Sequence, residues 1–106
     1  MGEVVVARGD VWWMEQPDEK GRPVLVVSRD AANEAMRRVV AAKVTTTIRS
    51  GRSQLHLGRA EGLLTESVAN FDDLITVSKA MLVRKLGSLG PRLHELCATL
   101  RLMADC

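Results

Sequence analysis

A proline at the head of an apolar run is the feature that most restricts how this 106-residue chain can fold. Pro23 follows Gly21 and Arg22 and leads directly into Val24-Leu25-Val26-Val27. Because proline has a fixed φ and no backbone N–H, it suits the first position of a strand and favours an extended Arg22. We expect a buried strand over residues 23–28, with Arg22 directly before it, so that its guanidinium is held at the edge of the core. The alternative for Arg22 is an ordinary solvated loop position.

The length predicts a single domain over residues 1–106, because a chain of this size supports one core and not two. Hydrophobic residues make up 46% of the sequence and charged residues 26%, which is typical of a soluble globular protein. No segment approaches the roughly 20 apolar residues that span a bilayer, and the first residues lack the basic start of a signal peptide. We therefore expect a cytoplasmic protein with no membrane partner.

Neither cysteine lies in a Cys-x-x-Cys pattern, and the two histidines have no partners at ligand spacing; these residues are Cys97, Cys106, His56 and His94. We therefore expect no metal site, no cofactor and no disulfide framework.

Charge is distributed unevenly along the chain. Residues 29–59 contain seven basic and two acidic side chains, a net +5, whereas residues 60–75 contain four acidic and no basic side chains. A basic middle segment can attract phosphates, and the alternative is a solvated charged face. Trp12, Trp13 and Phe71 are the only aromatic residues, which argues against a base-stacking platform of the RRM or cold-shock kind.

Short β-strand patterns dominate the sequence, and the spacing of apolar residues becomes helical only at the carboxyl end. Strands are expected at residues 11–14, 23–28, 39–44, 54–57, around 67–69, 74–77 and 82–86, with a short helix over 30–36 capped by Asp30. A final helix is expected after Pro91, with an apolar stripe of Leu93, Leu96, Cys97, Leu100 and Met103. This order predicts a mainly β (α+β) protein: a small closed β-barrel with a carboxyl-terminal α-helix packed on it.

Adjacent residues of a strand face opposite sides, so Trp12 and Trp13 cannot both fill one core. One of the two is expected at a second surface. Because tryptophan is enriched at protein interfaces, this pair predicts a homodimer.

Four blocks in order resemble the MazF/PemK family of toxin endoribonucleases. They are Arg8-Gly9-Asp10-Val11-Trp12, the Gly21 to Ser28 run, a strand closing on Thr45, and Phe71-Asp72-Asp73-Leu74-Ile75-Thr76-Val77-Ser78-Lys79. The resemblance covers nearly the whole chain. It implies an SH3-like barrel with a carboxyl-terminal helix, shared with the gyrase poison CcdB, that works as a homodimer. It also implies metal-free cleavage of single-stranded RNA at short motifs and silencing by a cognate antitoxin.

The resemblance places the family's catalytic arginine and threonine at Arg22 and Thr45, with Asp72 as a further catalytic candidate. The chain departs from the family in reading Asp72-Asp73 where Asp-Gln is common, and in having Asn70 where some members use an arginine. The loop over residues 15–21, which borders the RNA groove in the family, is short and acidic here. Expected RNA-binding residues are Lys20, Arg29, Thr46, Thr47 and Arg49.

Metal-free RNA cleavage uses the substrate's 2′-hydroxyl as nucleophile and leaves a 2′,3′-cyclic phosphate. One proton must be removed, one returned, and negative charge on the phosphate stabilised. Arg22 suits the last task, because a guanidinium grips two phosphate oxygens and stays protonated at physiological pH. We expect Thr45 to donate a hydrogen bond to the same phosphate, with its two threonine neighbours as competitors. The proton acceptor stays open between Asp72 and His56.

Two other functions fit the same fold. A CcdB-like inhibitor toxin would act without chemistry, and an SH3-like module would bind a peptide or nucleic acid passively. The Arg22 and Thr45 blocks favour the enzyme over both.

Overall fold

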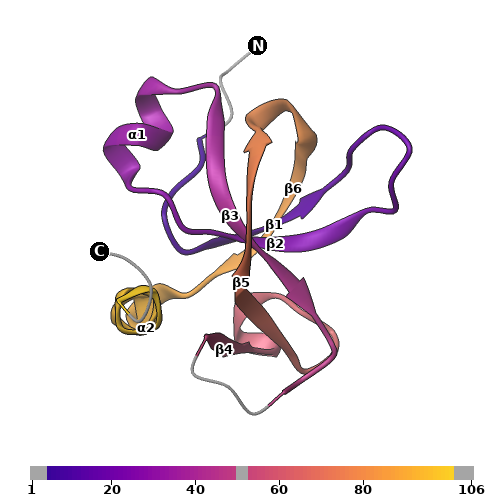
Figure 1. Cartoon of the computed structure of the whole chain (residues 1–106), viewed down its shortest axis with the longest axis vertical. Helices are drawn as coiled ribbons and strands as arrows, with labels where there is room; N and C mark the ends of the chain where they lie inside the picture. The colour runs from indigo at the N-terminus through magenta and orange to yellow at the C-terminus, as the bar shows by residue number, and fades with distance from the viewer. Residues whose placement is uncertain (1–4, 50–52, 102–106) are drawn as a thin grey trace.

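The protein folds as one antiparallel sheet with a helix at its carboxyl end, in a computed structural model that describes residues 5–49 and 53–101. The strands have the spatial order β4-β5-β3-β2-β1-β6. They are β1 (Asp10–Met14), β2 (Arg22–Val26), β3 (Arg38–Thr45), β4 (Gln54–Leu57), β5 (Ser67–Ser78) and β6 (Leu82–Ser88). Helix α1 (Asp30–Ala35) joins β2 to β3, and α2 (Leu93–Leu100) ends the described chain (Figure 1). Single 3-10 turns are η1 (Arg59–Glu61), η2 (Lys79–Met81) and η3 (Gly90–Arg92). The expected mainly β protein with a carboxyl-terminal helix is confirmed.

The two short strands expected over residues 67–69 and 74–77 are one 12-residue strand, β5, which runs through the centre of the molecule in Figure 1. The residues between the two expected strands form a bulge in β5. Ala42 pairs with Leu74 whereas the next residue, Lys43, pairs with Asn70, so residues 71–73 lie outside the ladder. An insertion of this kind bends a strand and redirects its side chains.

The expected closed barrel is wrong, because the sheet is open. Its edge strands are β4 and β6, and no ladder joins them within the described part of the chain. Instead η1 lies directly against the backbone of β6. A Cβ on Gly62 would overlap the carbonyl oxygen of Leu86, and one on Gly87 would overlap that of Glu61. Two glycines therefore allow a loop to cover the β6 edge by direct backbone contact.

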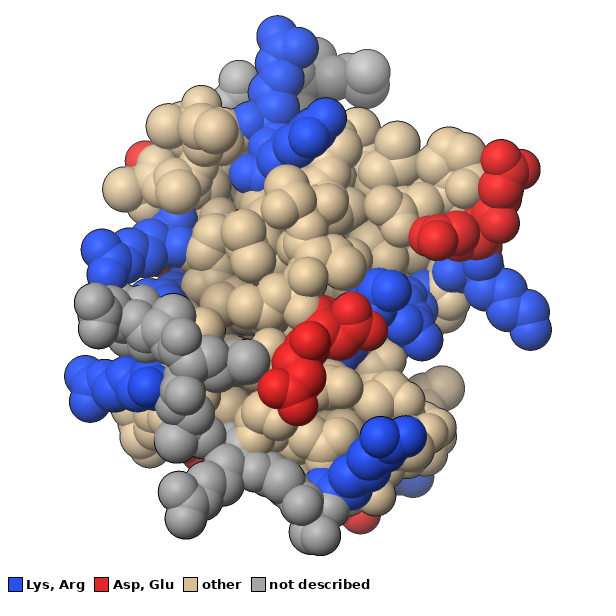
Figure 2. Space-filling model, in the orientation of Figure 1, with Lys and Arg blue, Asp and Glu red and all other residues tan. Residues whose placement is uncertain are grey.

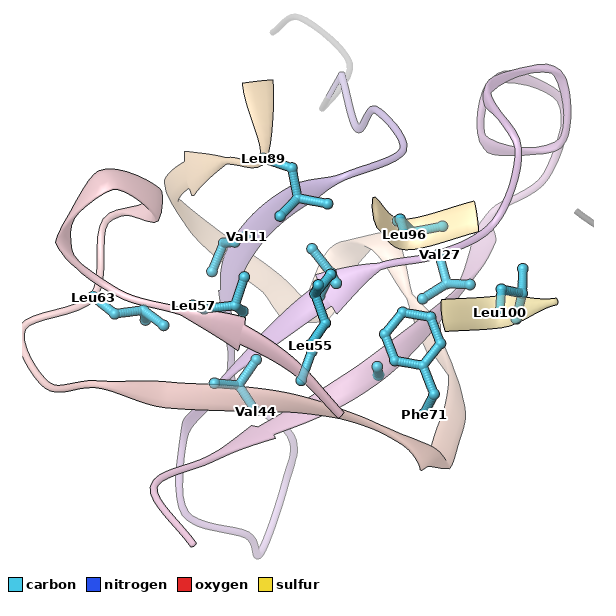
Figure 3. Close-up of a cluster of buried hydrophobic side chains, with 13 residues drawn as sticks. Val11, Val27, Val44, Leu55, Leu57, Leu63, Phe71, Leu89, Leu96 and Leu100 are labelled. Atoms are coloured by element: carbon cyan, nitrogen blue, oxygen red, sulfur yellow. The ribbon is translucent and has the colours of Figure 1, made fainter. Parts of the chain in front are cut away.

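Both faces of the sheet are buried, because neighbouring strand residues alternate between them. On one face Leu96 and Leu100 of α2 lie in a cluster with Val27 and Phe71 (Figure 3). The opposite face holds a second cluster that contains Trp12. Remaining members of the second cluster are Val6, Met14, Val24, Val26, Val39, Ala41, Val77 and Leu82.

The two tryptophans are separated as expected. Trp12 is 8% exposed, and its indole Nε1 donates to the Asp10 carboxylate at 3.2 Å. Trp13 belongs to neither cluster and lines a surface pocket of about 250 Å³ with the highly exposed Leu64. Trp13 is therefore the tryptophan that presents apolar surface.

Three expectations about single residues are wrong. Asp30 does not cap α1: the cap position is Arg29, and the Asp30 carboxylate accepts from the Arg8 backbone N–H at 2.6 Å. Leu93 is 41% exposed although it lies on the predicted apolar stripe. Cys97 is half-buried and disulfide-bonded, contrary to the expectation from cysteine spacing. Met103, also expected on the stripe, lies outside the described residues.

Arg92 ties α2 to the loops beneath it. Its guanidinium bonds the Glu95 carboxylate at 2.8 and 3.0 Å, the buried Glu61 carboxylate at 3.1 Å and the His56 carbonyl at 2.8 Å. The Glu95 hydrogen bond raises the pKa of Arg92 against the opposing effect of burial. The same hydrogen bond lowers the pKa of Glu95.

This pair makes stability depend on pH. Because the pKa of Glu95 is lower in the folded chain than in the unfolded chain, its stabilising effect is complete above its ordinary pKa of about 4.5 and is lost as pH falls through the folded-state value. Urea unfolding should therefore show wild type more stable than Glu95→Gln at pH 7, with the difference shrinking under acid conditions. An unchanged difference at pH 7 and pH 3 would contradict this assignment.

Candidate functional site

Pro23 ends the ladder between β2 and β3. Successive backbone N–H groups of a strand point alternately to its two neighbouring strands. The Val27 N–H donates to the Val40 carbonyl of β3 at 2.8 Å. Position 23 is an even number of residues away, so its backbone nitrogen also points towards β3. Proline has no N–H to donate there. Pairing between the two strands accordingly begins at Val24 and Lys43.

Beyond that end of the ladder, Arg22 and Thr45 line one polar pocket of about 290 Å³. The register that pairs Val24 with Lys43 would set Arg22 opposite Thr45 if it continued, which explains why the two residues meet. The other lining residues are Lys43, Thr47, Arg49, Gln54, Asn70 and Asp73. The two principal catalytic candidates from different parts of the sequence are thus brought together.

The backbone of Arg22 is fixed from the other side by β1. Arg22 pairs with Met14, and Pro23 pairs with Trp13. At Gly21 a Cβ would lie 2.6 Å from Cζ2 of the Trp13 indole, so only glycine lets the ring cover the backbone there. The Gly-Arg-Pro order therefore positions Arg22 beside the pocket through its neighbours on both sides.

The pocket suits an anion that carries several oxygens. It presents three cations, Arg22, Lys43 and Arg49, against one carboxylate, Asp73. Arginine and lysine are the usual side chains that bind phosphate. The Thr45 hydroxyl oxygen accepts from the Thr47 backbone N–H at 3.1 Å, which leaves its hydrogen for a second acceptor in the pocket.

A second hollow of about 340 Å³ shares Arg22 and Lys43 with this pocket. Its other lining residues, Met14, Glu19, Lys20 and Gly21, come from β1 and the loop before β2. The two hollows thus form a continuous groove across the ends of β2 and β3. We call this the β2–β3 groove.

The β2–β3 groove contains three of the five expected RNA-binding residues, namely Lys20, Thr47 and Arg49. Thr46 is exposed but lines neither hollow. Arg29 lies at the start of α1, after the last residue of β2, whereas Arg22 is the first residue of β2. The expected set is therefore only partly brought together.

Neither expected proton acceptor lines the groove. The Asp72 carboxylate accepts from the Ser53 hydroxyl at 2.6 Å and is not among the residues that line either hollow. His56 is exposed on β4, between two buried leucines. The carboxylate in the pocket is instead Asp73.

The chain matches the family model of the PemK-like, MazF-like toxins of type II toxin-antitoxin systems over residues 7–103. This chain belongs to the MazF/PemK family. It is 41% identical over 102 residues, 94% of each chain, to a protein named probable endoribonuclease MazF5 of Mycobacterium tuberculosis (strain ATCC 25618 / H37Rv). The resemblance seen in the four sequence blocks is confirmed.

Solved structures agree with this family assignment. An endoribonuclease in complex with its cognate antitoxin, from a mycobacterial species, superposes with a TM-score of 0.75 and 30% identity over 94% of this chain and 99% of that one. A MazE-MazF structure from Deinococcus radiodurans superposes with a TM-score of 0.76 at 20% identity, over 98% and 100% of the chains. The second likeness shows that the open sheet with its carboxyl-terminal helix is the fold of MazF toxins.

Four residues that line the pocket of Arg22 and Thr45 in this MazF-family chain were not among the predicted site residues: Lys43, Gln54, Asn70 and Asp73. Gln54 and Asn70 pair across β4 and β5, and the Gln54 amide oxygen accepts from the Arg49 backbone N–H at 2.9 Å. One available signal was the alternation along β3, which puts Lys43 on the same face as Thr45. The bulge that brings Asp73 to them has no comparable sequence signal.

Charge on the molecular surface is mixed. Figure 2 shows basic side chains spread around one face, with acidic side chains beside basic ones near its middle. The basic middle segment of the sequence therefore does not produce a uniform positive field on this face. Among the described residues no group of three or more His, Cys, Asp or Glu side chains could hold a metal ion. The helices of residues 5–49 and 53–101 include none long and apolar enough to cross a membrane.

Proposed function

We propose that this protein is a sequence-specific endoribonuclease toxin that cleaves single-stranded RNA without a metal ion. It would work in the cytoplasm, as one domain over residues 1–106. The observation that carries the proposal is the meeting of Arg22 and Thr45 in one polar pocket of a MazF-family chain. A relative named as a probable endoribonuclease at 41% identity supports the same activity.

In the proposed reaction the scissile phosphate lies between Arg22 and Thr45. The 2′-hydroxyl of the preceding ribose attacks phosphorus, and the bond to O5′ breaks, leaving a 2′,3′-cyclic phosphate and a 5′-hydroxyl. Arg22 stabilises the negative charge that grows on the two non-bridging oxygens. Thr45 donates its hydroxyl hydrogen to one of the same oxygens.

The β2–β3 groove supplies contacts to the flanking nucleotides. Lys20 lines one hollow and Arg49 lines the other, and Thr47 offers a further hydroxyl in the pocket that would hold the scissile phosphate. Arg29 and Thr46 lie outside the groove and would reach RNA only beyond it. Asp72, held by Ser53, is not proposed as a reacting group.

The direct test is cleavage of a long single-stranded RNA in EDTA, followed by mapping of the cut. Replacing the one ribose 5′ to the mapped cut by deoxyribose should stop cleavage and leave binding nearly unchanged, because only the attacking hydroxyl is removed. Mass spectrometry of the normal products should show a cyclic phosphate or its hydrolysis product. Cleavage of the deoxy-substituted strand at the RNA rate, or a requirement for magnesium, would contradict the mechanism. Complete inactivity would favour the CcdB-like inhibitor or the SH3-like binding module.

We further propose two protein partners: a second copy of the chain and a cognate antitoxin. Trp13 and Leu64 expose apolar surface suited to a subunit interface, since aromatic side chains are enriched there. The cations of the β2–β3 groove suit an acidic antitoxin segment with apolar anchors. Such a segment would cover the RNA site.

Light scattering of the protein alone should give twice the 11.6 kDa chain mass. Saturating antitoxin should then displace a fluorescent, deoxy-substituted RNA strand, because both occupy the same groove. Antitoxin that binds while the RNA remains bound and cut at the normal rate would show that the sites are separate. A stable, active monomer would refute the dimer.

A further inference from the structure

Lys43 and Asp73 face each other inside the pocket that holds Arg22 and Thr45. The Lys43 Nζ lies 3.9 Å from the Asp73 Oδ2. We propose that these two side chains are the acid–base pair of RNA cleavage, with Asp73 removing the 2′-hydroxyl proton and Lys43 returning a proton to O5′. This assignment rests on the proposed function and names the proton carriers that the function leaves open.

Few side chains that line the pocket can accept or donate a proton near neutral pH. Asp73 is the only carboxylate, and no histidine or cysteine is present, among the described residues that line it. Guanidinium groups and threonine hydroxyls are poor proton acceptors near neutral pH. An ionised carboxylate is an acceptor only, and a protonated lysine is a donor only. The pair therefore offers one group for each of the two proton transfers.

The β5 bulge places Asp73 in the pocket. Phe71, at its first position, is buried in the core, and its backbone N–H donates to the Ser53 carbonyl at 2.8 Å. The next residue, Asp72, is held by the Ser53 hydroxyl. Asp73 is the last residue before pairing with β3 resumes at Leu74 and Ala42. Bulges of this kind occur next to active sites, where they redirect a side chain.

The exposure of the pair agrees with a chemical role. The Lys43 side chain is 31% exposed and the Asp73 side chain 51% exposed, so both are open to a ligand in the groove. An ion pair this exposed and this long contributes little to folding. Its removal should leave the fold intact, which makes the roles testable by substitution.

The step balances in atoms and protons. The Asp73 carboxylate takes the proton of the 2′-hydroxyl while O2′ bonds to phosphorus, and the P–O5′ bond breaks as O5′ takes a proton from the Lys43 ammonium. Asp73 is then protonated and Lys43 neutral. Because they are 3.9 Å apart, one proton passes from Asp73 to Lys43, directly after a small side-chain movement or through one water, and restores both groups.

The test compares Asp73→Asn with Asp72→Asn in single-turnover cleavage of a mapped RNA strand. Removing a general base costs about 10²–10⁴-fold, so Asp73→Asn should be slower by at least 100-fold. Asp72→Asn, which removes an equal charge from the adjacent residue outside the pocket, should lose less than about fivefold. Asp73→Asn cleaving at the wild-type rate, or the reverse order of the two variants, would overturn the proposal.

Lys43→Met is tested on two substrates: the ordinary strand, and one in which sulfur replaces O5′ at the cut. A thiolate leaves without protonation, so a general acid is needed only for the oxygen substrate. Lys43→Met should be slower by about 100-fold or more on ordinary RNA and near the wild-type rate on the sulfur substrate, whereas Asp73→Asn should stay slow on both. Equal losses for Lys43→Met on both substrates would overturn its role as the acid.

Two controls separate this proposal from the proposed function. Binding of a deoxy-substituted strand and urea unfolding show whether each variant is folded and still holds RNA. If the wild-type protein cuts no RNA, the proposed function fails and this assignment fails with it. If the wild type cuts while Asp73→Asn cuts equally fast, only the acid–base assignment fails.

Discussion

The missing N–H of Pro23 is the constraint on which the candidate site depends. A complete ladder between β2 and β3 would pair Arg22 with Thr45 and close the space between the strand ends. Because Pro23 cannot donate towards β3, pairing starts two residues later, at Val24 and Lys43. Arg22 nevertheless remains fixed through its pairing with Met14 on β1. Pro23 thus opens the pocket on the side of β3, while Arg22 stays paired with β1 on the other side.

The rest of the sheet supports this opening. Cores on both faces bury β2 and β3, with Val24, Leu25 and Val26 fully inaccessible. The strand ends are therefore held on a rigid base, which a phosphate-binding site needs if its donors are to be preorganised. The same rigid base carries the β5 bulge, which places Asp73 against Lys43. The pocket of Arg22 and Thr45 combines fixed cations with one carboxylate, Asp73, an arrangement that a uniform basic patch would lack.

Sequence reasoning found what depends on local pattern. It predicted the strands around Trp12 and Leu55, the final helix, and the Arg22 and Thr45 positions, because alternation, proline and motif order are all visible in one dimension. It missed the open sheet, in which β6 has the loop at Gly62 against its backbone and, among the described residues, no pairing with β4. It also took Asp72 for the carboxylate of interest, since the residue that a three-residue bulge directs into a pocket depends on partners from other strands.

The central claim is that Arg22 stabilises charge that develops on the phosphate only in the transition state. The most direct measurement is single-turnover cleavage by Arg22→Ala and Arg22→Lys, with Arg37→Ala, next to the far end of β3, as the control. Arg22→Ala should lose about 10²–10³ in rate, as for removal of one preorganised donor. Arg22→Lys should recover little, because an ammonium lacks the two-pronged geometry, and Arg37→Ala should cut normally. Equal rates for Arg22→Ala and wild type, with both proteins folded, would contradict the account.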